Sequence, residues 1–133
     1  MIVPVSAVFA SALAVLMLAL AYRVSTFRLK YKKGVGHTDD PDFESAVRSH
    51  ANLTEYAPIF LILLVVGELN GIGTQIIYWV GLTFVVGRLL HVWGMAKGRG
   101  GPHKGRLVGI LLSWLAILVL AVLVVWNVVK INL

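Results

Sequence analysis

The sequence predicts an all-α integral membrane protein, built as a bundle of four transmembrane helices. Hydrophobic residues make up 59% of its 133 residues and charged residues only 14%, which is typical of membrane proteins rather than soluble domains. Four long apolar segments cover residues 3–22, 45–69, 76–94 and 107–129. Each is long enough to cross a hydrocarbon core of about 30 Å as a helix. We therefore expect one transmembrane domain over residues 1–133, without a separate soluble domain.

The first segment, residues 3–22, contains no charged residue. Its end, Ala19-Leu20-Ala21, resembles a signal-peptidase site. However, no positive charge precedes the apolar run and three further spans follow, so we interpret the segment as a retained helix.

The second segment is the most informative, because its uncharged stretch, Ala57–Gly67, is too short to cross a bilayer alone. The span must therefore bring Arg48, Asn52 and Glu55 to the membrane edge or below it. Polar and ionisable groups at that depth are candidates for a functional site. At about 100° per residue these three side chains share one stripe of the helix, and His50 points to the opposite face.

The third and fourth segments carry fewer polar residues. Arg88 stands inside a long apolar stretch, and we expect it to form a structural ion pair with Glu55 or Glu68. Around the start of the fourth segment, Gly105 and Gly109 have the small-xxx-small spacing that permits close helix packing, although this pattern is common in apolar helices.

Basic residues are distributed unevenly between the loops. Nine of the 12 lysines and arginines fall in residues 23–42 and 97–106, whereas the loop around residues 70–74 has none. The positive-inside rule predicts that the two basic loops are cytoplasmic and that both termini lie outside. This asymmetry accounts for the net charge of +6, so we expect membrane lipids rather than nucleic acid as partners.

The chain contains no cysteine, so any thiol chemistry must be brought by a ligand. We predict no metal site, because the histidines show no metal-ligand spacing; they are His37, His50, His91 and His103.

Two stretches resemble the MAPEG family, the membrane-associated proteins in eicosanoid and glutathione metabolism. Residues 48–58 (RSHANLTEYAP) match the family pattern of Arg, a polar residue, Asn, Glu and Pro on the second helix. Residues 87–94 (GRLLHVWG) are similar to the second family block, in which an Arg precedes an aromatic-rich helix end. The resemblance covers nearly the whole chain and is greatest to the small bacterial members, so we expect a multi-pass protein of the bacterial inner membrane.

The resemblance implies a homotrimer in which glutathione binds near the cytoplasmic side, between neighbouring subunits. It places four residues of the second helix around the tripeptide, namely Arg48, Asn52, Glu55 and Tyr56. His50 would serve the site of the adjacent subunit, which agrees with its opposite position on the helical wheel. The residue types suit the ligand, because Arg binds carboxylates, Glu binds an ammonium group, and Asn pairs with peptide groups.

The resemblance also implies a catalytic guanidinium near the start of the fourth helix, which lowers the thiol pKa toward the reactive thiolate. Arg106 is the candidate, with Lys104 as the alternative, and Arg28 or Arg23 would supply a guanidinium from the neighbouring subunit. His91 and Met95 stand where well-studied eukaryotic members carry tyrosines. His91 can still hydrogen-bond a ligand, whereas Met95 loses that contact.

The predicted function is that of a membrane-bound glutathione transferase or peroxidase. Its substrates would be lipophilic electrophiles or lipid hydroperoxides, with glutathione as co-substrate. The alternative function is a non-catalytic, lipid-binding scaffold of the same family. Separately, the stripe of Arg48, Asn52 and Glu55 has the alternative interpretation of a salt-bridged polar seam that fixes helix packing. A small multidrug transporter is disfavoured, because the first span lacks the membrane carboxylate of that class.

Overall fold

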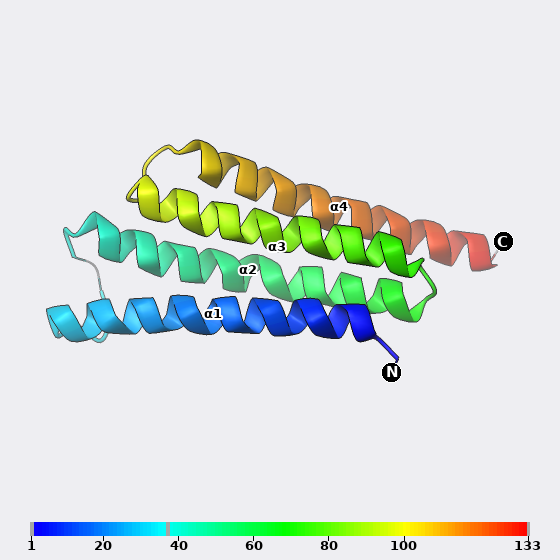
Figure 1. Cartoon of the computed structure of the whole chain (residues 1–133), viewed down its shortest axis with the longest axis horizontal. Helices are drawn as coiled ribbons and strands as arrows, with labels where there is room; N and C mark the ends of the chain where they lie inside the picture. Colours follow the sequence, from blue (N-terminus) through cyan, green and yellow to red (C-terminus); the bar gives the residue numbers. More distant parts are fainter. Residues whose placement is uncertain (1, 37, 133) are drawn as a thin grey trace.

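The computed structural model describes residues 2–36 and 38–132, which form a bundle of four α-helices. The helices lie side by side and alternate in direction (Figure 1). All four are long and apolar enough to cross a membrane, which confirms the expected all-helical architecture. Their bounds are α1 Pro4–Tyr31, α2 Pro41–Leu69, α3 Thr74–Lys97 and α4 Lys104–Asn132.

The first helix extends beyond the segment that its hydropathy predicts. It continues through Tyr31, so Arg23 and Arg28 are helical rather than part of a loop. Residues 23–31 contain neither glycine nor proline, and basic residues in the last turn are favourable at the negative end of the helix dipole. The helix ends at Lys32, which adopts a left-handed conformation with φ of 50°.

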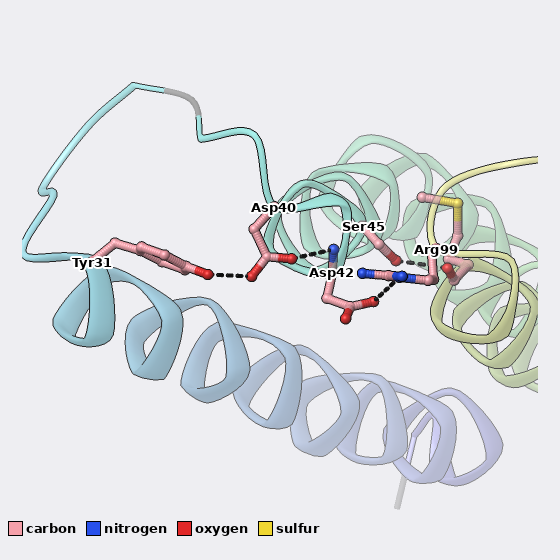
Figure 2. A network of polar contacts seen from close by, with 6 residues as sticks. Tyr31, Asp40, Asp42, Ser45 and Arg99 are labelled. Carbon is pink, nitrogen blue, oxygen red and sulfur yellow. Dashed lines mark hydrogen bonds and ion pairs between the residues drawn. The ribbon is translucent and has the colours of Figure 1, made fainter.

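The second helix begins at an Asp–Pro pair, with Asp40 as N-cap and Pro41 in the first turn. The Asp40 carboxylate accepts hydrogen bonds from the backbone N–H of Asp42 at 2.9 Å and from the hydroxyl of Tyr31 at 2.5 Å (Figure 2). Both hydrogen bonds lower the pKa of Asp40, and the bond from the Tyr31 hydroxyl has the larger effect. Asp40 therefore stays ionised at neutral pH, where its charge suits the helix N-terminus.

The connections place the chain's basic loops together. The loop from α1 to α2 and the loop from α3 to α4 lie at one end of the bundle, whereas both termini and the loop from α2 to α3 lie at the other (Figure 1). The sequence assigns the two basic loops to one side of the membrane, and the fold brings them to one end.

The core between the helices is apolar. Phe60 of α2 stacks on Phe84 of α3, with ring centroids 3.7 Å apart and planes 1° from parallel. Apolar side chains also cover much of the outer surface, as at Leu118 and Trp126 of α4, which are 61% and 67% exposed. Such a surface suits lipid or another subunit, and the helices are held together mainly by close packing and polar contacts.

At the end opposite the basic loops, Glu68 of α2 binds the N-terminus of α1. Its carboxylate accepts hydrogen bonds from the backbone N–H of Val5 at 3.0 Å and of Ser6 at 2.8 Å, and from the Ser6 hydroxyl at 2.6 Å. Helix α1 has no side-chain cap of its own. Glu68 therefore satisfies N–H groups that the start of a helix leaves without partners.

Glycines allow α3 and α4 to pack most closely of all the helix pairs. A Cβ atom on Gly109 of α4 would lie closer than 3.0 Å to backbone atoms of Gly87 and His91 on α3. A Cβ on Gly94 of α3 would meet the backbone of Gly105 and Arg106 in the same way. The small-xxx-small pair of α4 is thus used for backbone contact with α3.

This packing predicts that Gly109→Ala destabilises the bundle, because backbone atoms cannot move aside for the new methyl group. We expect a loss of at least about 1–3 kcal/mol, typical of overpacking, and a lower midpoint of thermal unfolding in detergent. Gly73→Ala is the matched control, because the nearest atom to its added Cβ is 4.0 Å away. Equal midpoints for the two variants would contradict the close contact.

Candidate functional site

The end of the bundle that carries the basic loops contains a cavity of about 770 Å³. This volume lies in the range of about 300–1,000 Å³ that is common for small-molecule sites. One part of its wall is polar and is formed by Asn52, Tyr56, His91, His103, Lys104 and Arg106. Another part is apolar and comes from the first turns of α4, with Leu107, Ile110 and Trp114.

A second cavity of about 120 Å³ adjoins the first. The two share Asn52, His91, Gly100 and Arg106 as lining residues. The smaller cavity is also lined by Arg48, together with Glu44, Ser45 and Met95. The result is a polar recess that continues into a wider, partly apolar space.

The fold therefore brings together five of the residues that the sequence predicts for a site. Three come from α2, one from α3 and one from α4; they are Arg48, Asn52, Tyr56, His91 and Arg106. These residues lie on three helices that are far apart in the sequence. The packing of the helices, rather than a local motif, therefore assembles the recess.

In the described part of one chain, three other predicted site residues line neither cavity. Glu55 is exposed, and His50 and Arg28 are half-buried on other surfaces. The Arg28 guanidinium lies 5.5 Å from the ring centroid of Phe43, and its buried Nη1 has no hydrogen-bond partner among the described residues. The proposed roles of these three residues need a second subunit and remain predictions.

Arg88 lies directly behind the cavity wall and is only 1% exposed. Its Nη1 donates to Oδ1 of Asn52 at 2.7 Å, and its Nε donates to the hydroxyl of Ser113 at 2.9 Å. The guanidinium thus connects α3 to both α2 and α4. Because it occupies the oxygen of the Asn52 amide, it leaves the amide N–H donors of Asn52 available to a ligand.

The expected ion pair of Arg88 with Glu55 or Glu68 is therefore wrong. Glu68 is engaged at the N-terminus of α1, and Glu55 is exposed. Neutral oxygens take the place of the carboxylate, and the rings of Tyr56 and Phe84 lie 5.4 Å and 5.6 Å from the guanidinium carbon. Aromatic faces attract a buried cation, so they offset part of its desolvation.

Sequence reasoning missed this arrangement because the partners of Arg88 are ordinary residues. Nothing in the sequence marks Ser113 as its acceptor, since a serine in an apolar helix usually bonds to its own backbone. The Ser113 hydroxyl makes both bonds: it accepts from Arg88, and it donates to the backbone carbonyl of Gly109 at 2.8 Å. Glu44 and Trp114 are further cavity residues that carry no motif.

Arg106 lies in the first turns of α4, close to Lys104. Its Nη1 donates to the carbonyl of Gly100 at 2.7 Å, so its side chain turns back toward the loop that precedes α4. The start of α4 is also capped by His103, whose Nδ1 accepts from the backbone N–H of Gly105 at 3.1 Å. Two basic side chains and the positive end of a helix dipole make this corner of the cavity attractive to anions.

The described residues contain no group of three or more His, Asp or Glu side chains that would hold a metal ion. His37, one of the four histidines, lies outside the described residues. The polar walls of the two cavities carry basic side chains, two imidazoles, one amide, one phenol and the carboxylate of Glu44.

Four membrane-length helices and a polar cavity at one end define an integral membrane protein with a cavity of small-molecule size. The family model of the MAPEG family matches residues 6–126. The chain therefore belongs to the MAPEG family.

Two relatives agree with this assignment. The chain is similar to the inner membrane protein YecN of Escherichia coli (strain K12), with 30% identity over 122 residues, which is 92% of this chain and 91% of the relative. It is also similar to human microsomal glutathione S-transferase 2, with 33% identity over 96 residues, which is 70% of this chain and 60% of the relative. Together with the four spans, the first match identifies an integral multi-pass inner membrane protein.

The Arg88 contacts predict that Arg88→Lys destabilises the bundle. A single ammonium group cannot reproduce the forked geometry that reaches Asn52 and Ser113 together, and it keeps the buried charge. We expect a loss on the order of 1.5–3 kcal/mol, measured as a lower midpoint of thermal unfolding. Arg48→Lys, at an exposed position of the same end, should leave the midpoint unchanged. An unchanged midpoint in Arg88→Lys would refute the bridging role.

Proposed function

We propose that the protein is a membrane-bound glutathione transferase or peroxidase that acts on lipophilic electrophiles or lipid hydroperoxides. The observation that carries this proposal is the pair of adjoining cavities that Arg48, Asn52, Tyr56 and Arg106 line between them. Membership of the MAPEG family and the similarity to a microsomal glutathione S-transferase support a glutathione-transferase-like role.

The donor set suits glutathione, which has two carboxylates, an ammonium group and a thiol. Arg48 offers bidentate donors to a carboxylate, and the free amide donors of Asn52 suit a peptide carbonyl. The ammonium group needs a carboxylate, for which Glu55 is the residue that matches the family pattern. Glu44, which lines the smaller cavity, is a second carboxylate close to Arg48.

The thiol would be activated by Arg106. A free thiol with a pKa of about 8.5 is mostly protonated at neutral pH, and a nearby guanidinium stabilises the thiolate. Arg106 lines both cavities, whereas Lys104 lines only the larger one. We therefore assign the activating role to Arg106.

In the transfer reaction the thiolate sulfur attacks an electrophilic carbon of the second substrate. A sulfur–carbon bond forms while the leaving group departs with the bonding electrons, or while an activated double bond accepts them. The thiol proton is released to water at the cavity mouth. The apolar wall formed by Leu107, Ile110 and Trp114 would hold the hydrophobic part of the electrophile.

We further propose that the working unit is a homotrimer with its basic loops in the cytoplasm and both termini outside. The polar groups outside the single-chain cavity support this, because a neighbouring subunit would bring Glu55, His50 and Arg28 to a shared site. The alternative of a lipid-binding scaffold needs the apolar wall but none of the polar recess.

Thiolate formation tests the function. The ultraviolet absorbance of bound glutathione, followed against pH, should show a thiol pKa below its value in water for the unmodified protein. Arg106→Ala should raise that pKa and slow the chemical step, with a smaller effect on affinity. Lys104→Ala is the control and should leave the titration unchanged. Absence of thiolate at neutral pH in the unmodified protein would leave the scaffold as the better account.

A second experiment tests the subunit arrangement. Glu55→Gln should weaken glutathione binding about ten- to hundredfold, since losing a charge-assisted contact costs on the order of 1.5–3 kcal/mol. Glu44→Gln should have a smaller effect. Calorimetric titration measures both affinities, and light scattering in mild detergent measures the mass of the assembly. A stable monomer, or a dominant effect of Glu44→Gln, would place the ligand within one chain.

A further inference from the structure

The loop between α3 and α4, residues 98–103, forms part of the cavity wall and also holds Arg106. The backbone of Gly100 and Gly101 lines the larger cavity. Arg106 Nη1 donates to the Gly100 carbonyl at 2.7 Å and lies 3.5 Å from the carbonyl oxygen of Gly101. The direction of the guanidinium therefore depends on the position of this loop.

Gly100 is connected in turn to the start of α2. Its backbone N–H donates to the carbonyl of Met95 at 3.0 Å, and the buried hydroxyl of Ser45 donates to the same carbonyl at 2.7 Å. A continuous path of hydrogen bonds thus runs from Ser45 through Met95 and Gly100 to Arg106. Figure 2 shows the beginning of this path, where a dashed line marks the hydrogen bond that the Ser45 hydroxyl donates.

An ion pair makes a second connection between α2 and the loop. Arg99 Nε donates to Oδ1 of Asp42 at 3.1 Å, with side chains that are 60% and 43% exposed (Figure 2). Arg99 has φ of 49° and Gly100 has φ of 81°, so two successive residues are left-handed. A non-glycine residue keeps this conformation only where its surroundings support it, and Asp42 supplies such support.

The carboxylate that binds Arg99 is itself held in place. The backbone N–H of Asp42 donates to Asp40, and Asp40 also accepts from Tyr31 at the end of α1. The polar contacts in Figure 2 therefore continue from α1 through the first turn of α2 to the loop before α4.

We propose that Asp42, Ser45, Arg99 and Gly100 are positioning residues that fix the loop and thereby direct the Arg106 guanidinium at the cavity. Asp42 and Arg99 line neither cavity and act only through Arg106, whereas Ser45 and Gly100 also form part of the cavity wall. The inference deepens the proposed function, on which its catalytic part rests, because it assigns a means of orienting the group that stabilises the thiolate.

Two variants, each with a matched control, test this inference in the full-length protein bound to glutathione. Asp42→Asn removes the charge that holds Arg99, and Asp39→Asn removes a neighbouring exposed charge. Gly100→Ala strains the loop at φ of 81°, and Gly71→Ala creates the same strain at φ of 82° in the loop at the other end of the bundle. An added Cβ meets no atom within 4 Å at either glycine, so no steric clash accompanies the backbone strain.

Asp42→Asn and Gly100→Ala should raise the pKa of the bound thiol and lower kcat about two- to fivefold, with KM for glutathione unchanged. An exposed ion pair is worth up to about 1 kcal/mol, which is about a fivefold change in rate. The two controls should leave the pKa of the bound thiol unchanged. Asp42→Glu should restore that pKa to its value in the unmodified protein. Equal shifts in variants and controls, or a rise in KM without a change in kcat, would overturn the inference.

A measurement without glutathione separates this inference from the proposed function. Because the chain has no cysteine, a spin label can be attached at Pro102→Cys in the loop alone. Its mobility should increase with Asp42→Asn and not with Asp39→Asn. If the unmodified protein forms no thiolate but the label responds, the proposed function fails while the positioning of the loop stands. A label that does not respond to Asp42→Asn overturns the inference whatever the protein does with thiols.

Discussion

The buried guanidinium of Arg88 is the constraint on which the cavity end of the bundle depends. A cation in a membrane helix is costly, so its hydrogen-bond partners must be held in fixed positions. Asn52 on α2 and Ser113 on α4 are those partners, and each contact links another helix to α3. The same bonds orient the Asn52 amide, so one interaction both joins three helices and sets the polarity of the cavity wall. The rings of Tyr56 and Phe84 lie against the same guanidinium.

The close contact between α3 and α4 is the second feature that fixes the geometry of the cavity. Gly109 lets the backbone of α4 approach His91, and Gly94 lets the backbone of α3 approach Arg106. The two helices are therefore closest where both contribute to the cavity, and His91 and Arg106 line the same recess. A methyl group at either glycine would separate the helices and change the distance between these two side chains. Packing of small residues thus fixes functional geometry without taking part in any chemistry.

Much of the architecture could be predicted from the sequence, because the bilayer permits few solutions. Length and hydropathy predict four helices, and loop charge predicts which loops share an end. The stripe of Arg48 and Asn52 follows from helical periodicity. The partner of Arg88 could not be predicted, because a carboxylate is the usual expectation and the actual acceptors are an amide and a hydroxyl from distant helices. The continuation of α1 to Tyr31 was also missed, because hydropathy measures how much of a helix suits lipid rather than where the helix ends.

The position of Glu55 gives a physical reason for an assembly larger than one chain. A span needs about 20 residues, and counting back from Leu69 at the end of α2 places its start near residue 50, so Glu55 falls inside the span. Glu55 is exposed, and among the described residues it has no hydrogen-bond or ion-pair partner. A carboxylate facing hydrocarbon costs several kcal/mol, so a bare monomer would be penalised at this position. A neighbouring subunit, or a ligand cation held between subunits, removes that penalty. Glu55 is thus a residue of the family pattern that the described residues of one chain leave without a partner.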